Sequence, residues 1–164
     1  MKELTPGLEL GARYVLVRRL GRGGSAEVWL ADDREQGERV ALKVFSEEFA
    51  ADAPRLARLE AEVAGAHGLP PERVVRMDGL FRDAGRTILA MEYLSGGDLG
   101  QFRGRSFEAW AGAIDDVAAA LEALHARGLV HRDLKASNVF LDEAGHAKLG
   151  DLGLLSLAGV PADG

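Results

Sequence analysis

Four polar side chains in the last third of the chain have the types and spacing that phosphoryl transfer requires. They are Asp133, Lys135, Asn138 and Asp151. An aspartate can accept the proton of an attacking hydroxyl, and a lysine two residues later can neutralise charge on a migrating phosphoryl group. The amide and the second carboxylate offer the hard oxygen ligands that Mg²⁺ prefers between phosphates. The set therefore suits in-line transfer from a metal-bound nucleotide to a hydroxyl.

The sequence around these residues forms one long joint motif. Residues 130–138 read VHRDLKASN, and residues 151–153 read DLG. Together they resemble the catalytic loop H-R-D-L-x-x-x-N and the metal motif D-F-G of bacterial serine/threonine protein kinases, with Leu152 in place of phenylalanine. The resemblance implies that His131 is structural, and the lysine in the loop marks the serine/threonine branch rather than the tyrosine branch.

A glycine-rich turn lies between two stretches of strand-forming residues. Residues 21–28 read GRGGSAEV, with Ala26 where the third glycine of G-x-G-x-x-G would stand. A dinucleotide-binding loop must lead into a helix, but Val28, Trp29 and Leu30 favour a strand. The sequence also lacks the Gly-Lys-Ser/Thr ending of a phosphate-binding P-loop. Alone, the segment would be an ordinary hairpin turn; in context it predicts a β-hairpin lid over phosphates.

Lys43 supports this interpretation of the glycine-rich turn. It ends the segment VALK at residues 40–43, which is similar to the V-A-I-K strand of the kinase family. A lysine among apolar strand residues needs an anion, and phosphates together with a helix carboxylate would supply one.

That carboxylate is expected on a helix over residues 54–68, where two candidates compete. Glu60 and Glu62 cannot both face the sheet, because they are two residues apart on a helix. The resemblance favours Glu60 as the partner of Lys43. Counting back from Val74 favours Glu62, unless Pro70 and Pro71 belong to an inserted turn.

Residues 91–99, MEYLSGGDL, resemble the hinge between the two lobes of a kinase. The resemblance places Met91 behind the adenine, backbone groups of Glu92 and Leu94 at the adenine edge, and Asp98 near the ribose. The residues that it assigns to ATP binding are Leu20, Gly21, Arg22, Gly23, Gly24, Ser25, Ala26, Val28, Ala41, Lys43, Met91, Glu92, Leu94 and Asp98.

Hydrophobic periodicity predicts strands first and helices later. Strands are expected at 14–20, 27–31, 40–45, 74–81 and 87–94, with the single helix at 54–68 among them. A long helix follows, starting near Ser106 and ending at Gly128, with an apolar stripe of Phe107, Trp110, Ile114, Val117, Leu121 and Leu124. Residues 139–141 and 147–149 are expected to form a hairpin between the two chemical motifs.

The predicted fold class is α+β, a protein-kinase-like two-lobe fold. An antiparallel N-lobe with its hinge is expected at about 10–94, and an incomplete helical C-lobe at 95–164, with nucleotide in the cleft between lobes. Only residues 154–164 follow the DLG motif, so A-P-E and the later helices are absent from the sequence. Three interpretations remain open: a fragment of a longer kinase, a naturally short kinase, or a regulatory ATP-binding module with little turnover.

Composition limits the partners. The formal charge of −6 argues against nucleic acid, and no apolar run is long enough to span a bilayer. The absence of cysteine excludes disulfides and is compatible with a cytoplasmic protein. The expected partners are Mg²⁺, ATP and a protein substrate, or the chain itself as substrate. An apolar patch on the incomplete helical lobe is also expected to bind a second copy or another protein.

Overall fold

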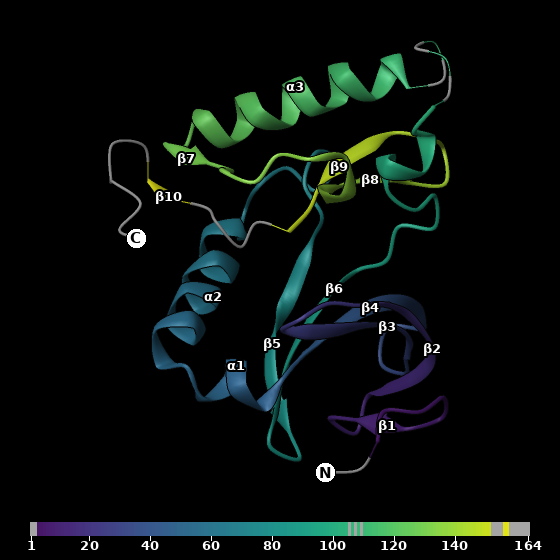
Figure 1. The fold of residues 1–164 in the computed structure, drawn as a ribbon, viewed down its shortest axis with the longest axis vertical. Helices are drawn as coiled ribbons and strands as arrows, with labels where there is room; N and C mark the ends of the chain where they lie inside the picture. The colour runs from purple at the N-terminus through teal and green to yellow at the C-terminus, as the bar shows by residue number, and fades with distance from the viewer. Residues whose placement is uncertain (1–2, 105, 107, 109, 152–155, 158–164) are drawn as a thin grey trace. The chain divides into compact units, whose positions relative to one another are not determined.

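The computed structural model describes residues 3–104, 106, 108, 110–151 and 156–157, which fall into two units. The first unit consists of residues 1–63 and 76–93, and the second consists of residues 64–75 and 94–164. Figure 1 labels the elements of both units. The chain enters the second unit at Ala64, returns to the first at Arg76 and enters the second again at Leu94.

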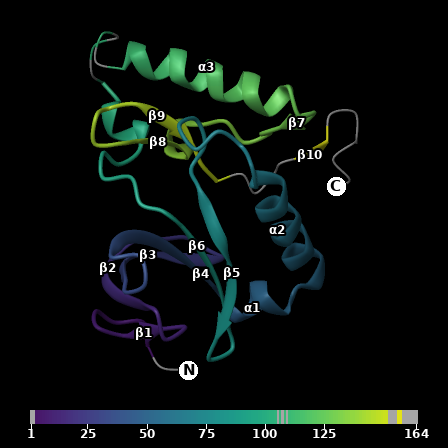
Figure 2. The ribbon, with the colours of Figure 1, turned by 180° about the vertical axis from the view of Figure 1, so that it is seen from behind.

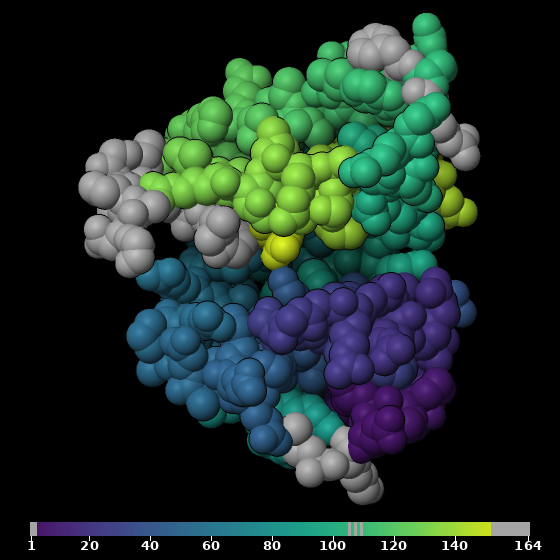
Figure 3. Space-filling model, viewed as in Figure 1, coloured from purple at the N-terminus to yellow at the C-terminus, as the bar shows by residue number. Residues whose placement is uncertain are grey.

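The first unit is built on an antiparallel sheet of six strands in the order β1-β2-β3-β4-β6-β5. Figure 3 shows β1 to β3 in purple and violet at the surface of this unit. The strands are β1 (Glu9–Leu10), β2 (Tyr14–Arg22), β3 (Ala26–Asp33), β4 (Glu38–Phe45), β5 (Met77–Asp83) and β6 (Arg86–Glu92). The strand predictions agree with β2, β3, β4 and β6; β5 begins three residues later than expected, at Met77.

Two helices follow β4 directly. The first, α1 (Glu47–Ala51), is a single turn that the sequence did not predict, because five residues are too few to show a helical period. Its N-cap is Ser46, whose hydroxyl oxygen accepts a hydrogen bond from the Phe49 N–H at 3.2 Å. The second, α2 (Ala53–Ala66), is the predicted helix, and its last three residues belong to the second unit.

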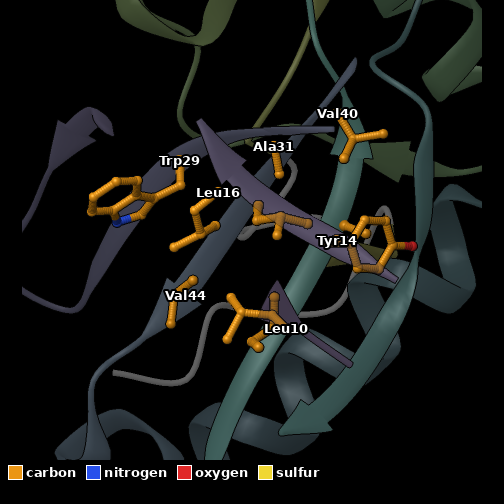
Figure 4. Packing of buried hydrophobic residues seen from close by; sticks show 10 residues of the cluster. Leu10, Tyr14, Leu16, Trp29, Ala31, Val40 and Val44 are labelled. Atoms are coloured by element: carbon orange, nitrogen blue, oxygen red, sulfur yellow. The ribbon is translucent and has the colours of Figure 1, made fainter. Parts of the chain in front are cut away.

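Alternation along β4 divides the apolar residues of the first unit into two clusters, because successive strand residues point to opposite faces. Val40, Leu42 and Val44 join Leu10, Leu16 and Trp29 in the larger cluster (Figure 4). Phe45 lies in the other cluster, with Ala26, Leu59 and Leu89. Lys43 shares the Phe45 face of the strand, so the α2 side of the sheet is the side on which this lysine lies.

The second unit contains one long helix and several short elements. The helix α3 (Ala111–His125) packs against the hairpin formed by β8 (Val139–Leu141) and β9 (Ala147–Leu149), as Figures 1 and 2 show. The hairpin has the bounds that the sequence predicted. The remaining elements are η1 (Leu99–Phe102), β7 (Leu129–Val130), η3 (Ala136–Asn138) and β10 (Ser156–Leu157), which pairs with β7.

The predicted stripe on the long helix is partly wrong. The helix begins at Ala111 after Trp110, not near Ser106, and Phe107 lies outside the described residues. Ala113, Ala120 and Leu124 are buried, whereas Ile114 is 43% exposed. Small alanines form the contact surface here, and periodicity in large apolar residues did not detect them. In the described part of the chain, no helix is long and apolar enough to cross a membrane.

Candidate functional site

The second unit brings together three of the four polar residues of the chemical motif. The Asp133 carboxylate accepts a hydrogen bond from Lys135 Nζ at 2.6 Å and another from Asn138 Nδ2 at 3.0 Å. The same Nδ2 also donates to the Asp133 carbonyl oxygen at 2.9 Å. Because both amide hydrogens of Asn138 point to Asp133, the atom left to coordinate a cation is the carbonyl oxygen Oδ1.

The charge state of Asp133 follows from these contacts. The hydrogen bond from Lys135, together with that from Asn138, lowers the pKa of the Asp133 carboxyl below its ordinary value. The hydrogen bond to Asp133 in turn raises the pKa of the Lys135 ammonium. Asp133 is therefore a carboxylate at neutral pH, as a group that accepts or orients a hydroxyl proton must be.

Backbone strain is concentrated around the same motif. Four non-glycine residues among those described have positive φ, and two of these are Arg132 (φ 60°) and Asp151 (φ 51°). Such conformations cost about 1–3 kcal/mol each and persist only where the surroundings impose them. They occur here next to Asp133 and at the first residue of the DLG motif, the positions to which the sequence assigned chemistry.

His131 holds the two strained segments together. Its ring is 1% exposed, and Nε2 lies 3.0 Å from the Gly150 carbonyl oxygen. Its Nδ1 accepts the Asp133 N–H at 3.3 Å. The two contacts are satisfied together by a neutral imidazole that carries its proton on Nε2. His131 therefore links the residue before Asp151 to the loop that carries Asp133, in agreement with the structural role expected for it.

Gly150 is a residue that the sequence analysis missed. A β-carbon at this position would lie 2.7 Å from the Phe140 ring and 3.1 Å from Val75, so only glycine fits. Its N–H donates to the Asn138 carbonyl oxygen at 2.9 Å. A glycine directly before the DLG motif was the signal for this close approach. It fixes Asp151 in the chain next to the loop that carries Asn138.

The donor set fits Mg²⁺ only in combination with phosphate oxygens. Among the described residues, no group of three or more histidine and acidic side chains is placed to hold a metal ion. Asn138 and Asp151 supply at most an amide oxygen and a carboxylate. This matches the usual way in which proteins hold Mg²⁺, with one or two protein ligands, water and substrate phosphates.

The first unit contains the glycine-rich turn, which joins β2 to β3. The Gly23 N–H donates to the Ala26 carbonyl oxygen at 2.8 Å, which closes a tight hairpin. Gly21, Gly23 and Gly24 all have ordinary negative or extended φ, and a β-carbon on each would make no close contact within the structure. Neither backbone conformation nor packing within the chain therefore explains the three glycines. Close approach of another molecule to the turn would explain them.

Lys43 lies in the middle of β4, paired in register with Val28 on one side and Leu89 on the other. Ala41, on the same face of the strand, is 6% exposed. The lysine thus projects from the interior of a sheet whose neighbouring strand, β3, begins at the glycine-rich turn.

For the partner of Lys43 the structure points away from Glu60 and toward Glu62. Glu62 is 8% exposed and shares the buried face of α2 with Leu59, whereas Glu60 is exposed. Leu59 packs with Phe45 of β4, so this face is turned toward the strand that carries Lys43. The preference for Glu60 came from the resemblance of the helix to the kinase segment, with Pro70 and Pro71 treated as an insertion. A shift of two residues moves a helical side chain to the opposite face.

The hinge residues are divided between the two units. Met91 and Glu92 end β6, and the Glu92 N–H donates to the Arg76 carbonyl oxygen at 2.9 Å. Leu94 and Asp98 belong to the second unit. The Asp98 side chain accepts the Gly100 N–H at 2.8 Å and caps η1, a structural role that the sequence did not predict.

Comparison with known proteins gives a consistent result. A model of the protein kinase domain family matches residues 14–160. The serine/threonine-protein kinase Pkn1 of Myxococcus xanthus is 36% identical over 158 residues, which cover 93% of this chain and 23% of Pkn1. The serine/threonine-protein kinase PkaA of Streptomyces coelicolor is 35% identical over 170 residues, which cover 93% of this chain and 31% of PkaA.

A solved structure of a point mutant of the PknI kinase domain from Mycobacterium tuberculosis is similar in fold. It aligns with a TM-score of 0.77 at 31% identity, over 98% of this chain and 67% of that chain. The curated relatives are much longer than this chain: the matched region spans only 23% of Pkn1 and 31% of PkaA.

Proposed function

Because the chain belongs to the protein kinase domain family, we propose that it transfers the γ-phosphoryl group of Mg·ATP to a serine or threonine hydroxyl. The observation that carries this proposal is the arrangement around Asp133. Its carboxylate is held at 2.6 Å by Lys135 and at 3.0 Å by the amide of Asn138, whose free oxygen suits a metal ion. A base, a cation and a metal ligand are thus tied to one another in a loop of six residues.

Asp133 accepts or orients the proton of the attacking hydroxyl. Its lowered pKa keeps it ionised, and its two hydrogen bonds restrict its orientation. Lys135 stabilises negative charge on the transferred group. Its ammonium has three hydrogens, so it can donate to a phosphoryl oxygen while it still contacts the carboxylate.

Asn138 Oδ1 and the Asp151 carboxylate are the groups that would hold Mg²⁺. A Mg²⁺ ion held there would supply positive charge to offset the charge that develops on the phosphates. The left-handed backbone at Asp151 and the hydrogen bond between Gly150 and Asn138 support these two ligands.

The glycine-rich turn, Lys43 and the hinge residues bind the nucleotide. The turn formed by Gly21, Arg22, Gly23, Gly24 and Ser25 lies over the phosphates, and Lys43 pairs with the α- and β-phosphates while Glu62 orients it. Leu20, Val28 and Ala41 contact the adenine ring, with Met91 behind it. Backbone groups of Glu92 and Leu94 bind the adenine edge. Asp98 reaches the ribose through the carboxylate oxygen that does not cap η1.

The acceptor is a protein or the chain itself, as the names of the serine/threonine-protein kinase relatives suggest. A cytoplasmic location and self-association through the second unit stay predictions. Ile114 and Leu134 are the large apolar side chains that are exposed among the described residues, at 43% and 50%.

Transfer of labelled phosphate tests the proposal. Wild-type protein with Mg²⁺ and γ-labelled ATP should label itself or a generic basic protein on serine or threonine. Asp133→Asn should lower the rate at least a hundredfold while it retains ATP binding, because the carboxylate acts on the acceptor. Binding of ATP by wild type without any transfer would identify a nucleotide-binding module instead. Full transfer by Asp133→Asn would contradict the role of this aspartate.

A further inference from the structure

Phe45 lies two residues after Lys43 on β4, and its ring is near the lysine ammonium. The distance from Lys43 Nζ to the centre of the Phe45 ring is 5.7 Å, within the range of a cation–π contact. Phe45 is only 5% exposed, whereas Lys43 is half-buried. Since residues two apart on a strand lie on the same face, this contact follows directly from the register of the strand.

The Phe45 ring is itself fixed by a second aromatic ring. Phe49 of α1 stacks on it with ring centres 4.4 Å apart and an angle of 23° between the planes. Phe49 is held in turn by the hydrogen bond from its N–H to the Ser46 hydroxyl. The Ser46 N–H donates to the Ser25 carbonyl oxygen at 2.8 Å, and Ser25 belongs to the glycine-rich turn. The short helix α1 therefore connects the turn to the ring beneath the lysine.

Phe45 also contacts the other elements that the proposed nucleotide site requires. It is paired in register with Ala26, which ends the glycine-rich turn. It packs with Leu59 of α2, and Val63 of the same helix contacts this cluster. Leu59 shares the buried face of α2 with Glu62. Phe45 thus lies on the strand that carries Lys43, pairs with the end of the glycine-rich turn and shares an apolar cluster with the helix that carries Glu62.

We propose that Phe45 is a positioning residue for Lys43, which holds the ammonium toward bound phosphates through its ring face. This inference rests on the proposed function. A lysine side chain loses considerable rotamer entropy when it is ordered, and a fixed ring restricts it before ATP arrives. The ring attracts the positive charge without acting as a hydrogen-bond acceptor, so the N–H groups remain able to donate to a carboxylate and to phosphate oxygens.

Fluorination of the ring tests this role without a change in packing large enough to unfold the protein. A trifluorinated phenylalanine at position 45 keeps the ring but removes most of the negative charge on its face. We expect the Kd for Mg·ATP, measured by calorimetry, to rise about three- to tenfold, and a monofluorinated ring to give an intermediate value. The KM for ATP should rise with it, while kcat changes by less than about twofold, because the ring acts on binding.

Phe81 offers a matched control in the same unit. Its ring stacks on Tyr14 at 5.3 Å and belongs to the opposite cluster from Phe45. Trifluorination at position 81 should leave the Kd for Mg·ATP within about twofold of wild type, since no cation–π contact to Lys43 depends on it. Phe45→Leu, which removes the ring but keeps an apolar side chain, should weaken ATP binding at least as much as fluorination does.

The outcomes separate this inference from the proposed function. If wild type binds Mg·ATP and trifluorination at position 45 leaves the Kd unchanged, the positioning role of Phe45 is wrong and the proposed function stands. An equal loss with fluorine at positions 45 and 81 would also overturn it, because the effect would then be general. If wild type binds no Mg·ATP at millimolar concentration, the proposed function fails and the inference fails with it.

Discussion

The two units present their candidate site residues by different physical means. In the first unit, Lys43 lies on a regular strand and Glu62 on the buried face of a helix, so periodicity determines where each points. In the second unit, Asp133 and Asp151 lie in irregular segments in which Arg132 and Asp151 itself have left-handed backbone. A side chain on a strand is oriented by the sheet, whereas a side chain on a strained loop must be oriented by specific hydrogen bonds.

The anchors of the two units differ in the same way. Apolar packing dominates the first, where the strands bury two clusters on opposite faces of the sheet. In the second, the buried imidazole of His131 bonds to Gly150 and Asp133, and the amide of Asn138 bonds to Asp133. Substitutions in the first unit should therefore act through lost packing or a lost ion pair. Substitutions in the second unit should lower phosphate transfer and the free energy of unfolding together.

One buried polar anchor of the first unit is the pair formed by Arg13 and Asp33. Asp33 is 2% exposed and accepts hydrogen bonds from Arg13 Nε at 2.8 Å and from Arg13 Nη2 at 2.6 Å. Asp33→Asn should lower the free energy of unfolding by about 2 kcal/mol, because the buried side chain loses its charged hydrogen bonds with Arg13, which then keeps Glu35 as its ion-pair partner. Asp32→Asn, at an exposed neighbour, should cost less than about 0.5 kcal/mol. Urea unfolding measures both. Equal stabilities of the two variants would contradict the difference in anchoring.

The same pair predicts how stability depends on pH. The hydrogen bonds from Arg13 and from the backbone N–H groups of Glu35 and Gln36 lower the pKa of Asp33 in the folded state. A lowered folded pKa gives stability that is present above the unfolded value of about 4 and is lost as the pH falls through the folded pKa. Wild type should lose stability more steeply than Asp33→Asn below about pH 4. Parallel curves would show that Asp33 does not carry this dependence.

His131 is the corresponding anchor of the second unit. His131→Ala should lower the free energy of unfolding by about 2 kcal/mol, since the Gly150 carbonyl and the Asp133 N–H lose a buried partner. Phosphate transfer should fall by more than the unfolded fraction explains, because both strained segments lose their link. His125→Ala, at the exposed end of α3, should change neither quantity by much. A fully active His131→Ala would show that the loops need no such link.

The smallest predicted effect compares two neighbouring glutamates of α2. Glu62→Gln should weaken Mg·ATP binding roughly tenfold, the size expected when a charged hydrogen bond is lost. Glu60→Gln should change it by less than about twofold, because Glu60 is exposed. Calorimetric titration of both variants decides between them. The reverse order would restore Glu60 as the partner of Lys43.

The sequence predicted most of the first unit and the chemical motif of the second, for reasons that the structure makes clear. A run of strand-forming residues identified β4, the strand that carries Lys43, and turn residues identified the hairpin at 139–149. The position of Glu62 was not resolved, because helix register changes by 100° for each residue of error. α1 and η1 were too short to show a period. Gly150 and Phe45 were missed because their roles depend on neighbours that are distant in sequence or on another element.

Titration of the chain with ATP tests the central claim, that the chain binds a Mg-bound nucleotide. In calorimetry, wild type should bind ATP in the presence of Mg²⁺ and much more weakly in excess EDTA. Lys43→Met, in the first unit, should weaken binding with or without the metal, because it removes a phosphate contact. Asp151→Asn, in the second, should weaken only the Mg²⁺-dependent part. Absence of binding by wild type at millimolar Mg·ATP, or an Asp151→Asn variant that keeps the full effect of Mg²⁺, would contradict the account.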